Sequence, residues 1–301
     1  MFLFVQLRKH ENFANLLRYS KMLSCLVVLI LMFSLPAPVE SSNPKVDPIL
    51  TRPAATIDTF SVISNARYFR NVKLEEADRF SGYGFDFEVA IPFKESMQFR
   101  LILPAYTRGK ARLIDPPTFE TITIKGPAGT FDYPTILFDH QLIDIDQAAY
   151  NLSYFVGFGK TIRDWGKLDT THGDTYNHQG DLFRLGVNSD GYVRNTGVRW
   201  LANVGLRAYI GSDDLNPAET GDDFFLIDLM TAAVFEPWKG SFHPAIELVY
   251  QGDIDRYHAV HLIPQVIVPL NSSIDLKAGT SINLTRDGES FGARLQMSYR
   301  R

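Results

Sequence analysis

The amino-acid sequence predicts an all-β protein, a transmembrane antiparallel up-and-down β-barrel of about twelve strands. Three observations predict this fold. Large apolar residues alternate with small or polar residues along most of the chain, the connections between these stretches are short and long in turn, and the N-terminus carries an apolar run typical of export.

The alternation is clearest at residues 82–93, GYGFDFEVAIPF. Every second residue is large and apolar, from Tyr83 to Phe93, and the residues between them include Asp86 and Glu88. Because successive side chains of a strand point to opposite faces, this stretch has one apolar face and one small or charged face. The apolar face contacts either a protein core or lipid.

The same pattern recurs to the end of the chain. Further strands are predicted at residues 60–68, 97–105, 148–158, 183–187, 198–210, 225–235, 242–250, 260–270, 274–284 and 291–299. Their length suits tilted strands that cross a bilayer. The stretch 260–270 is the least regular, because Pro264 and Pro269 cannot donate hydrogen bonds to a neighbouring strand. We find no comparable helical period and no clean linker, so we expect one domain.

The connections predict a further strand. Residues 236–241 and 269–273 form short connections, whereas residues 163–181 and 211–223 form long polar ones. Bacterial outer-membrane barrels have short periplasmic turns and long outer loops. If the turn at Lys94–Glu95 is periplasmic, one inward strand is missing between residues 107 and 147. We place it at residues 131–143, FDYPTILFDHQLI, which raises the number of strands to an even twelve.

The N-terminus has the layout of a secretory signal peptide. Residues 23–35 are apolar, basic residues precede them, and a stretch of small and polar residues follows. We therefore expect a signal peptide at 1–41, a periplasmic lead-in at 42–56 and the barrel at 57–301. A membrane-anchor helix is the alternative. The single cysteine, Cys25, lies within the predicted signal, so the mature chain has no disulfide.

Composition and motifs exclude several functions. The formal net charge is −4, which argues against nucleic acid as a partner. We find no phosphate-binding loop, dinucleotide fingerprint or zinc spacing, and we predict no cofactor and no metal site. One loop could bind a divalent cation, although polar outer loops commonly have such a composition without metal. Its candidate ligands are Asp169, His172, Asp174, His178 and Asp181.

The C-terminal residues resemble a known assembly signal. FGARLQMSYRR, residues 291–301, is similar to the last strand of Gram-negative outer-membrane proteins, by which the outer-membrane assembly machinery recognises them. That pattern prefers a terminal Phe or Trp, whereas this chain places Arg300 and Arg301 after Tyr299. The resemblance implies an outer-membrane barrel surrounded by lipid. A soluble periplasmic β-protein is the alternative, since its strands also have one apolar face.

In length, strand rhythm and exported start, the mature chain also loosely resembles the outer-membrane transporters of the phenol-degradation MetA-pathway family. That resemblance implies transport of small organic compounds through a twelve-stranded barrel.

The inward face of the predicted barrel contains the candidate site. Arg199, Asn203 and Arg207 lie on one face of one strand, and arginines that face acids across a lumen would select polar or anionic solutes. Alternatively, these charges pair with one another and fill a narrow barrel. The candidate lumen-facing residues are Asp86, Glu88, Gln98, Arg100, Arg199, Asn203, Arg207, Glu247, Asp275, Lys277 and Arg294.

These observations predict a channel or transporter for a small-molecule solute in the cell outer membrane, and not an enzyme. The alternatives are an outer-membrane enzyme that acts on lipid or lipopolysaccharide, and a structural barrel that transports nothing. His243 and His261 are inward or rim histidines in this prediction, and neither lies in a nucleophile motif. A serine within hydrogen-bond reach of either one would favour the enzyme.

Overall fold

A computed structural model of the 301-residue chain describes residues 46–301, apart from residues 58, 73–76, 114–120, 127–132, 161–166, 171–174, 178–179, 212–222, 241 and 254–255. The predicted signal peptide lies outside the described residues. Within them there is no helix long and apolar enough to cross a membrane.

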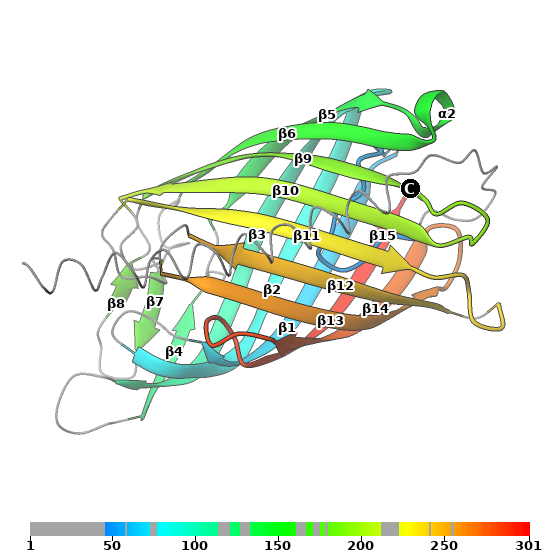
Figure 1. The fold of residues 1–301 in the computed structure, drawn as a ribbon. Helices are drawn as coiled ribbons and strands as arrows, with labels where there is room; N and C mark the ends of the chain where they lie inside the picture. The colour runs from blue at the N-terminus through cyan, green and yellow to red at the C-terminus, as the bar shows by residue number, and fades with distance from the viewer. Residues whose placement is uncertain are drawn as a thin grey trace, which may run out of the picture.

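Twelve antiparallel strands close into a barrel (Figure 1). They are β1 (Ser61–Val72), β2 (Ala77–Lys94), β3 (Met97–Leu113), β5 (Thr135–Ile143), β6 (Tyr150–Lys160), β9 (Asp181–Tyr192), β10 (Arg199–Ile210), β11 (Phe224–Val234), β12 (His243–Gly252), β13 (His258–Pro269), β14 (Ile274–Asn283) and β15 (Phe291–Arg300). The first and last strands pair from Ser61↔Arg300 to Arg70↔Phe291, which closes the ring.

Three shorter strands extend the sheet beyond one end of the barrel. They are β4 (Thr121–Gly126), β7 (Lys167–Thr170) and β8 (Thr175–Asn177), and β4 pairs with the end of β3. The described helix is a single turn, α2 (Ile145–Ala148), at the opposite end. We call the end with α2 and the C-terminus the turn end, and the end with β4, β7 and β8 the loop end (Figure 1).

The structure confirms the predicted closed barrel, including the strand inferred from parity. Residues 135–143 form β5, which pairs with β3 and β6. The prolines of β13 have a local effect. Partners of β13 and β14 are registered at Leu262↔Ile282 and again at Gln265↔Gly279, so the pairing omits Ile263 and Pro264, and Pro264 has no N–H to donate. Pro269 is registered with Asp275.

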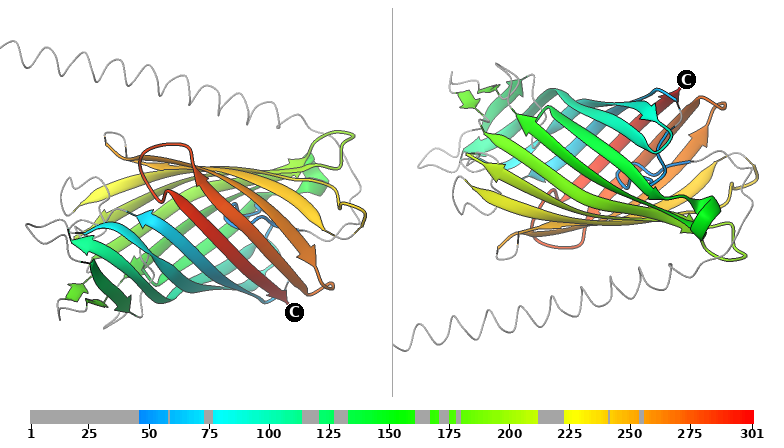
Figure 2. Two further views of the ribbon diagram at one scale, coloured as in Figure 1. Left: turned by 90° about the horizontal axis from the view of Figure 1, so that it is seen from below. Right: turned by 90° about the horizontal axis from the view of Figure 1, so that it is seen from above.

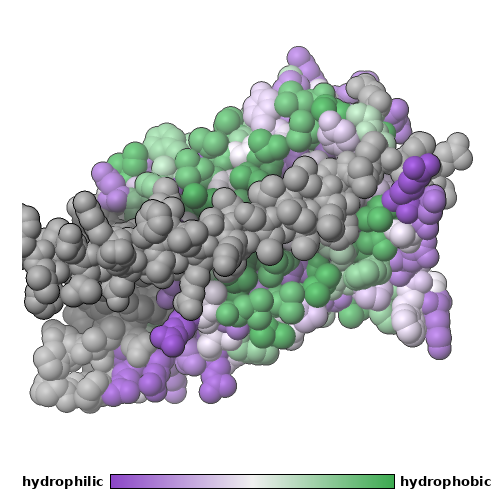
Figure 3. All heavy atoms as spheres, viewed as in Figure 1, coloured by the Kyte–Doolittle hydropathy of each residue, from purple (hydrophilic) through white to green (hydrophobic). Residues whose placement is uncertain are grey.

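The apolar face of residues 82–93 points out of the barrel. Phe85 is 44% exposed and Ile91 is 49% exposed, whereas Glu88 is 5% exposed. The last strand behaves alike, with Leu295 exposed and Gln296 buried. Figure 3 shows hydrophobic residues gathered over the strands, with hydrophilic residues toward the two ends. The interior of this barrel is therefore polar and its outside is apolar.

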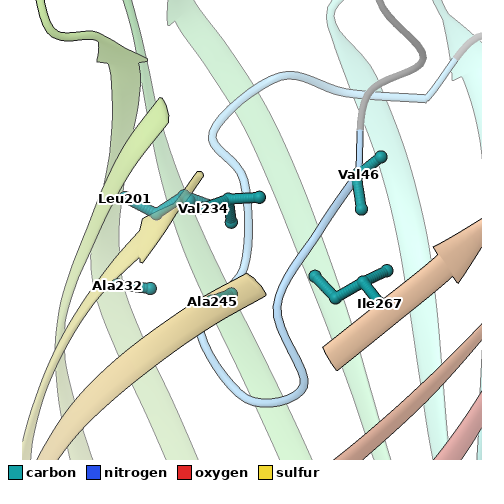
Figure 4. Packing of buried hydrophobic residues seen from close by; sticks show 6 residues of the cluster. All are labelled: Val46, Leu201, Ala232, Val234, Ala245 and Ile267. Atoms are coloured by element: carbon teal, nitrogen blue, oxygen red, sulfur yellow. The ribbon is translucent and has the colours of Figure 1, made fainter. Parts of the chain in front are cut away.

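Residues 46–57 lie inside the barrel near the turn end, and we call them the lumenal segment (Figure 2). Val46 packs in a buried cluster with Leu201, Ala232, Val234, Ala245 and Ile267 of the wall (Figure 4). Residues 46–56 belong to the stretch 42–56 that we expect to be a periplasmic lead-in, and residues 42–45 lie outside the described residues. The segment lies inside the barrel because the inward polar side chains and the backbone of the segment satisfy each other's hydrogen bonds.

Candidate functional site

Acidic side chains of the wall bind the backbone of the lumenal segment. Glu247 on β12 is fully buried, and its carboxylate accepts hydrogen bonds from the amides of Leu50 (3.0 Å) and Thr51 (2.8 Å). Asp190 on β9 accepts one from Ala54 at 2.7 Å. Hydrogen bonds to a charged acceptor are among the stronger ones in proteins, so these carboxylates hold the segment in place.

Amide side chains hold the segment from other directions. Asn203 on β10 accepts a hydrogen bond from the Arg52 amide at 2.7 Å and donates one to the Arg52 carbonyl at 2.8 Å. Ile49 donates to Gln265 at 3.0 Å and accepts from Gln296 at 3.1 Å. The side chains of the wall thus satisfy the hydrogen bonds of this backbone, as the backbone of a neighbouring strand would in a sheet.

An ion-pair cluster anchors the start of the segment. Arg199 contacts Asp190 at 2.8 Å and Asp47 at 2.9 Å, and Arg300 contacts Asp47 at 3.3 Å. Burial acts to raise the pKa of Asp47, but Arg199, Arg300 and Lys277 outweigh it and hold that pKa below its ordinary value. Asp47 is therefore a carboxylate that bridges the segment to the wall.

A second cluster lies at the tip of the segment. The Arg52 guanidinium contacts Glu88 of β2 at 2.6 Å, and Glu88 also contacts Arg100 of β3 at 3.4 Å. Arg100 in turn makes two hydrogen bonds of 2.6 Å to Asp139 of β5. This chain of charges crosses the lumen from the segment to the wall.

The chain of charges separates two cavities. A large cavity of about 720 Å³ opens on the loop side, and Ile49, Leu50 and Arg52 of the segment line its floor. A small cavity of about 50 Å³ lies on the turn side. Arg52, Glu88 and Arg100 line both cavities, so a route between them passes these three side chains.

The predicted lumen-facing residues fall into three groups. Asp86, Glu88, Arg100, Arg207 and Arg294 line the large cavity, and Gln98 lines the small one. Arg199, Asn203 and Glu247 instead bind the lumenal segment. Asp275 and Lys277 are buried 3.5 Å apart, and Asp275 also contacts Arg300 at 2.8 Å. Their part in solute passage stays a prediction.

The arginines predicted on one strand do not act as one row. Arg207 is the member that reaches the large cavity, where Asp228 of β11 binds it through contacts of 2.7 and 2.6 Å. The sequence reading missed Asp228, Asp190 and Asp139 as partners. An up-and-down barrel makes these strands neighbours, but the sequence does not give the register that sets the acids beside the arginines.

A serine and a histidine are within hydrogen-bond reach. Ser281 Oγ on β14 lies 3.0 Å from His261 Nδ1 on β13, and both residues line the large cavity. The serine is 1% exposed. His243 contacts the Phe235 carbonyl oxygen at 3.0 Å instead. The pair has the distance of a catalytic dyad, but its hydroxyl is nearly inaccessible and faces the lumen.

The described residues contain no group of three or more His, Cys, Asp or Glu side chains that could hold a metal ion. Of the candidate loop ligands, His172, Asp174 and His178 lie outside the described residues.

No family model and no curated protein matches this chain. Solved structures with a similar fold include the KdgM porin, with 6% identity, a TM-score of 0.42, and coverage of 79% of this chain and 98% of that one. The COG4313 outer membrane channel from Pseudomonas putida F1 has 11% identity and a TM-score of 0.47, over 88% of this chain and all of that one. The translocator domain of the autotransporter NalP from Neisseria meningitidis has 10% identity and a TM-score of 0.49, over 82% and 90%.

With identities this low and TM-scores below 0.5, these similarities carry no conclusion about this chain. The resemblance to the MetA-pathway family stays a prediction from the sequence, because no family model matches.

Proposed function

We propose that this protein is an outer-membrane channel or transporter through which a small molecule crosses the barrel lumen. The observation that carries this proposal is a closed barrel with an apolar outside and a polar interior that contains a cavity of about 720 Å³. An exposed apolar face around a full ring of strands suits a lipid environment, because a closed ring pairs the backbone groups of neighbouring strands and leaves no open sheet edge.

The proposed route begins in the large cavity at the loop end. It passes the Arg52–Glu88 contact and leaves beside the lumenal segment through the small cavity. The ion pair lies where the two cavities meet and restricts the route there. Movement of the Arg52 side chain, or of the segment itself, would widen it.

The proposal includes the way the protein reaches its membrane. Residues 1–41 act as the signal peptide for export, and the C-terminal strand β15 is the part that the assembly machinery recognises. The lipid of a Gram-negative outer membrane then surrounds the exposed apolar residues of the strands. The barrel catalyses no reaction in this account.

Swelling of proteoliposomes tests the proposal. The refolded protein is inserted into liposomes, and neutral sugars of increasing size are added outside. We expect small sugars to enter and large ones to be excluded, with no swelling of protein-free liposomes. Exclusion of every sugar by protein that is inserted and folded, as judged by its heat-modifiable migration on a gel, would overturn the proposal.

A hydrolase is the second candidate, and the 3.0 Å contact between Ser281 and His261 is the observation that favours it. Burial of the serine and its position inside the lumen argue against a lipid substrate. Turnover of a chromogenic ester by the folded protein separates the two candidates. We expect no turnover above the buffer rate. Turnover that Ser281→Ala abolishes would establish the hydrolase.

A further inference from the structure

Two pairs of arginines lie directly opposite each other on neighbouring strands. Arg67 of β1 is registered with Arg294 of β15, and Arg184 of β9 is registered with Arg207 of β10. All four side chains line the large cavity. Like charges at directly opposed positions destabilise a sheet, so two such pairs in one cavity call for a compensating charge.

The two pairs face each other across the lumen. Four strands, β14 to β11, separate them on one side of the ring, and β2, β3, β5 and β6 separate them on the other. They also lie at a similar height. Arg294 is three residues from the loop end of β15, and Arg207 is three residues from the loop end of β10. The four guanidinium groups therefore ring the loop side of the large cavity.

One arginine of each pair has a carboxylate partner of its own. Asp228 binds Arg207 through contacts of 2.6 and 2.7 Å, and Glu289 lies 3.3 Å from Arg294. Arg67 and Arg184 make no ion pair or hydrogen bond with any described residue, although the Arg67 guanidinium lies 5.9 Å from the centre of the Phe69 ring. One cation on each wall is therefore left without an acid in the described part of the chain.

The donor atoms give a second indication. The Nε atoms of Arg67, Arg184 and Arg294 are buried and have no hydrogen-bond partner among the described residues. A buried donor without an acceptor is costly, and an anion in the cavity would supply acceptors. The described lining as a whole is also cationic, with eight arginines against five acidic residues.

We infer that these four arginines form a binding site for a small organic solute with two carboxylates, one for each pair. A guanidinium group matches a carboxylate in two parallel hydrogen bonds, and each wall offers one guanidinium with no acid of its own. The inference rests on the proposed function, because it treats the large cavity as the solute's route. It names the substrate class of that route as dicarboxylates.

Isothermal titration calorimetry on the refolded protein tests the inference. The probes are adipate, hexanoate and 1,6-hexanediol, which share a six-carbon chain and carry two, one and no carboxylates. We expect adipate to bind at least about tenfold more tightly than hexanoate, since a hydrogen bond to a charged group contributes about 1.5–3 kcal/mol. We expect no heat from the diol. Equal affinities for adipate and hexanoate would overturn the inference.

Variants locate the site. Arg67→Gln and Arg184→Gln should each weaken adipate binding about tenfold or more and bring its affinity close to that of hexanoate. Both variants should fold, because each removes one member of a like-charged pair. Arg194→Gln is the matched control, since Arg194 is exposed in the turn before β10, at the other end of the barrel, and its loss changes the net charge equally.

Unchanged adipate affinity in the double variant Arg67→Gln/Arg184→Gln would overturn the inference. Should a glutamine variant fail to fold, Arg67→Lys and Arg184→Lys retain the charge but lose the paired donors, and a weakened adipate affinity is again expected. Calorimetry and the swelling assay separate the two claims. Swelling without adipate binding refutes this inference alone, whereas adipate binding without swelling refutes the proposed function alone.

Discussion

Glu247 shows at the scale of one residue how the barrel holds its own N-terminal segment. Its carboxylate is buried and accepts the amide hydrogens of Leu50 and Thr51. The amides of Leu50 and Thr51 both depend on this one side chain, and burial of the carboxylate without these donors would be unfavourable.

Glu247→Gln should loosen the lumenal segment. Both amides bond Oε1, and the Leu50 amide also lies 3.2 Å from Oε2. The variant has no charge, and it replaces one of these oxygens with an NH2 group, which cannot accept a hydrogen bond from an amide. We expect hydrogen exchange at these two amides to accelerate about tenfold or more, because a hydrogen bond to a charged group contributes about 1.5–3 kcal/mol. Glu236→Gln, at an exposed position beside the turn before β12, is the control and should leave exchange unchanged. Equal exchange in wild type and Glu247→Gln would contradict this account.

The contacts of Asp47 should make docking of the lumenal segment sensitive to acid. Arg199, Arg300 and Lys277 lower its pKa below the ordinary value of 3.8 in spite of burial. A lowered pKa in the docked state means that its contribution to docking is complete above pH 3.8 and declines as the pH falls through the docked-state pKa. We therefore expect the part of the exchange protection that Asp47 supplies, measured as the difference between wild type and Asp47→Asn, to stay constant from pH 7 to pH 5 and to fall under stronger acid.

Asp47→Asn isolates that contribution. The variant should show weaker protection at pH 7 and a smaller further loss in acid than wild type. An identical acid response in both proteins would show that Asp47 does not anchor the segment.

Alternation in the sequence predicted which side chains point inward, but it could not predict their partners. Arg52 and Asn203 are 151 residues apart, and Arg199 meets Val46 over 153 residues. Such contacts depend on which strands adjoin and on where the segment enters. The same alternation also predicts that Arg67 and Arg184 point inward, because each lies between outward apolar residues of a predicted strand.

The strands follow from the sequence because most of them alternate large apolar with small or polar residues, and because connections of alternating length order them in pairs. The lumenal segment does not follow from it. Residues 46–57 include Pro48 and Pro53 and have no period of two, so nothing local indicates that they enter the barrel. Their placement depends on the inward polar residues of many strands together.

The backbones of β2 and β3 approach closely at Gly82, which predicts that a larger side chain there disturbs the pairing of these strands. A Cβ atom at Gly82 would overlap the carbonyl oxygen of Arg108 on β3, whereas at Gly205 on β10 the nearest atom would be 3.5 Å away. Gly82→Val should therefore prevent β2 from pairing correctly with β3, and the protein should lose its heat-modifiable band on a gel. Gly205→Ala is the control and should fold as wild type does. Normal folding of Gly82→Val would refute this tight packing.

At the scale of the whole molecule, the barrel has an apolar outside and a polar interior. The lumenal segment divides this interior into two parts. The large cavity on the loop side and the small cavity on the turn side share Arg52, Glu88 and Arg100. The sequence left open whether the inward charges line a lumen or pair and fill it, and this arrangement combines the two alternatives. Many inward charges pair and fill the turn side of the lumen, whereas the loop side stays hollow and rich in arginine.

The single-channel conductance of the refolded protein in a planar bilayer tests the central claim, that solutes cross the lumen past Arg52, most directly. We expect discrete current steps from the wild type and larger steps from Arg52→Ala, because the variant removes the side chain that lies between the two cavities. Arg194→Ala removes an exposed arginine at the turn end and should leave the steps unchanged. Steps of equal size in wild type and Arg52→Ala, or silence from both once they are inserted and folded, would contradict the account.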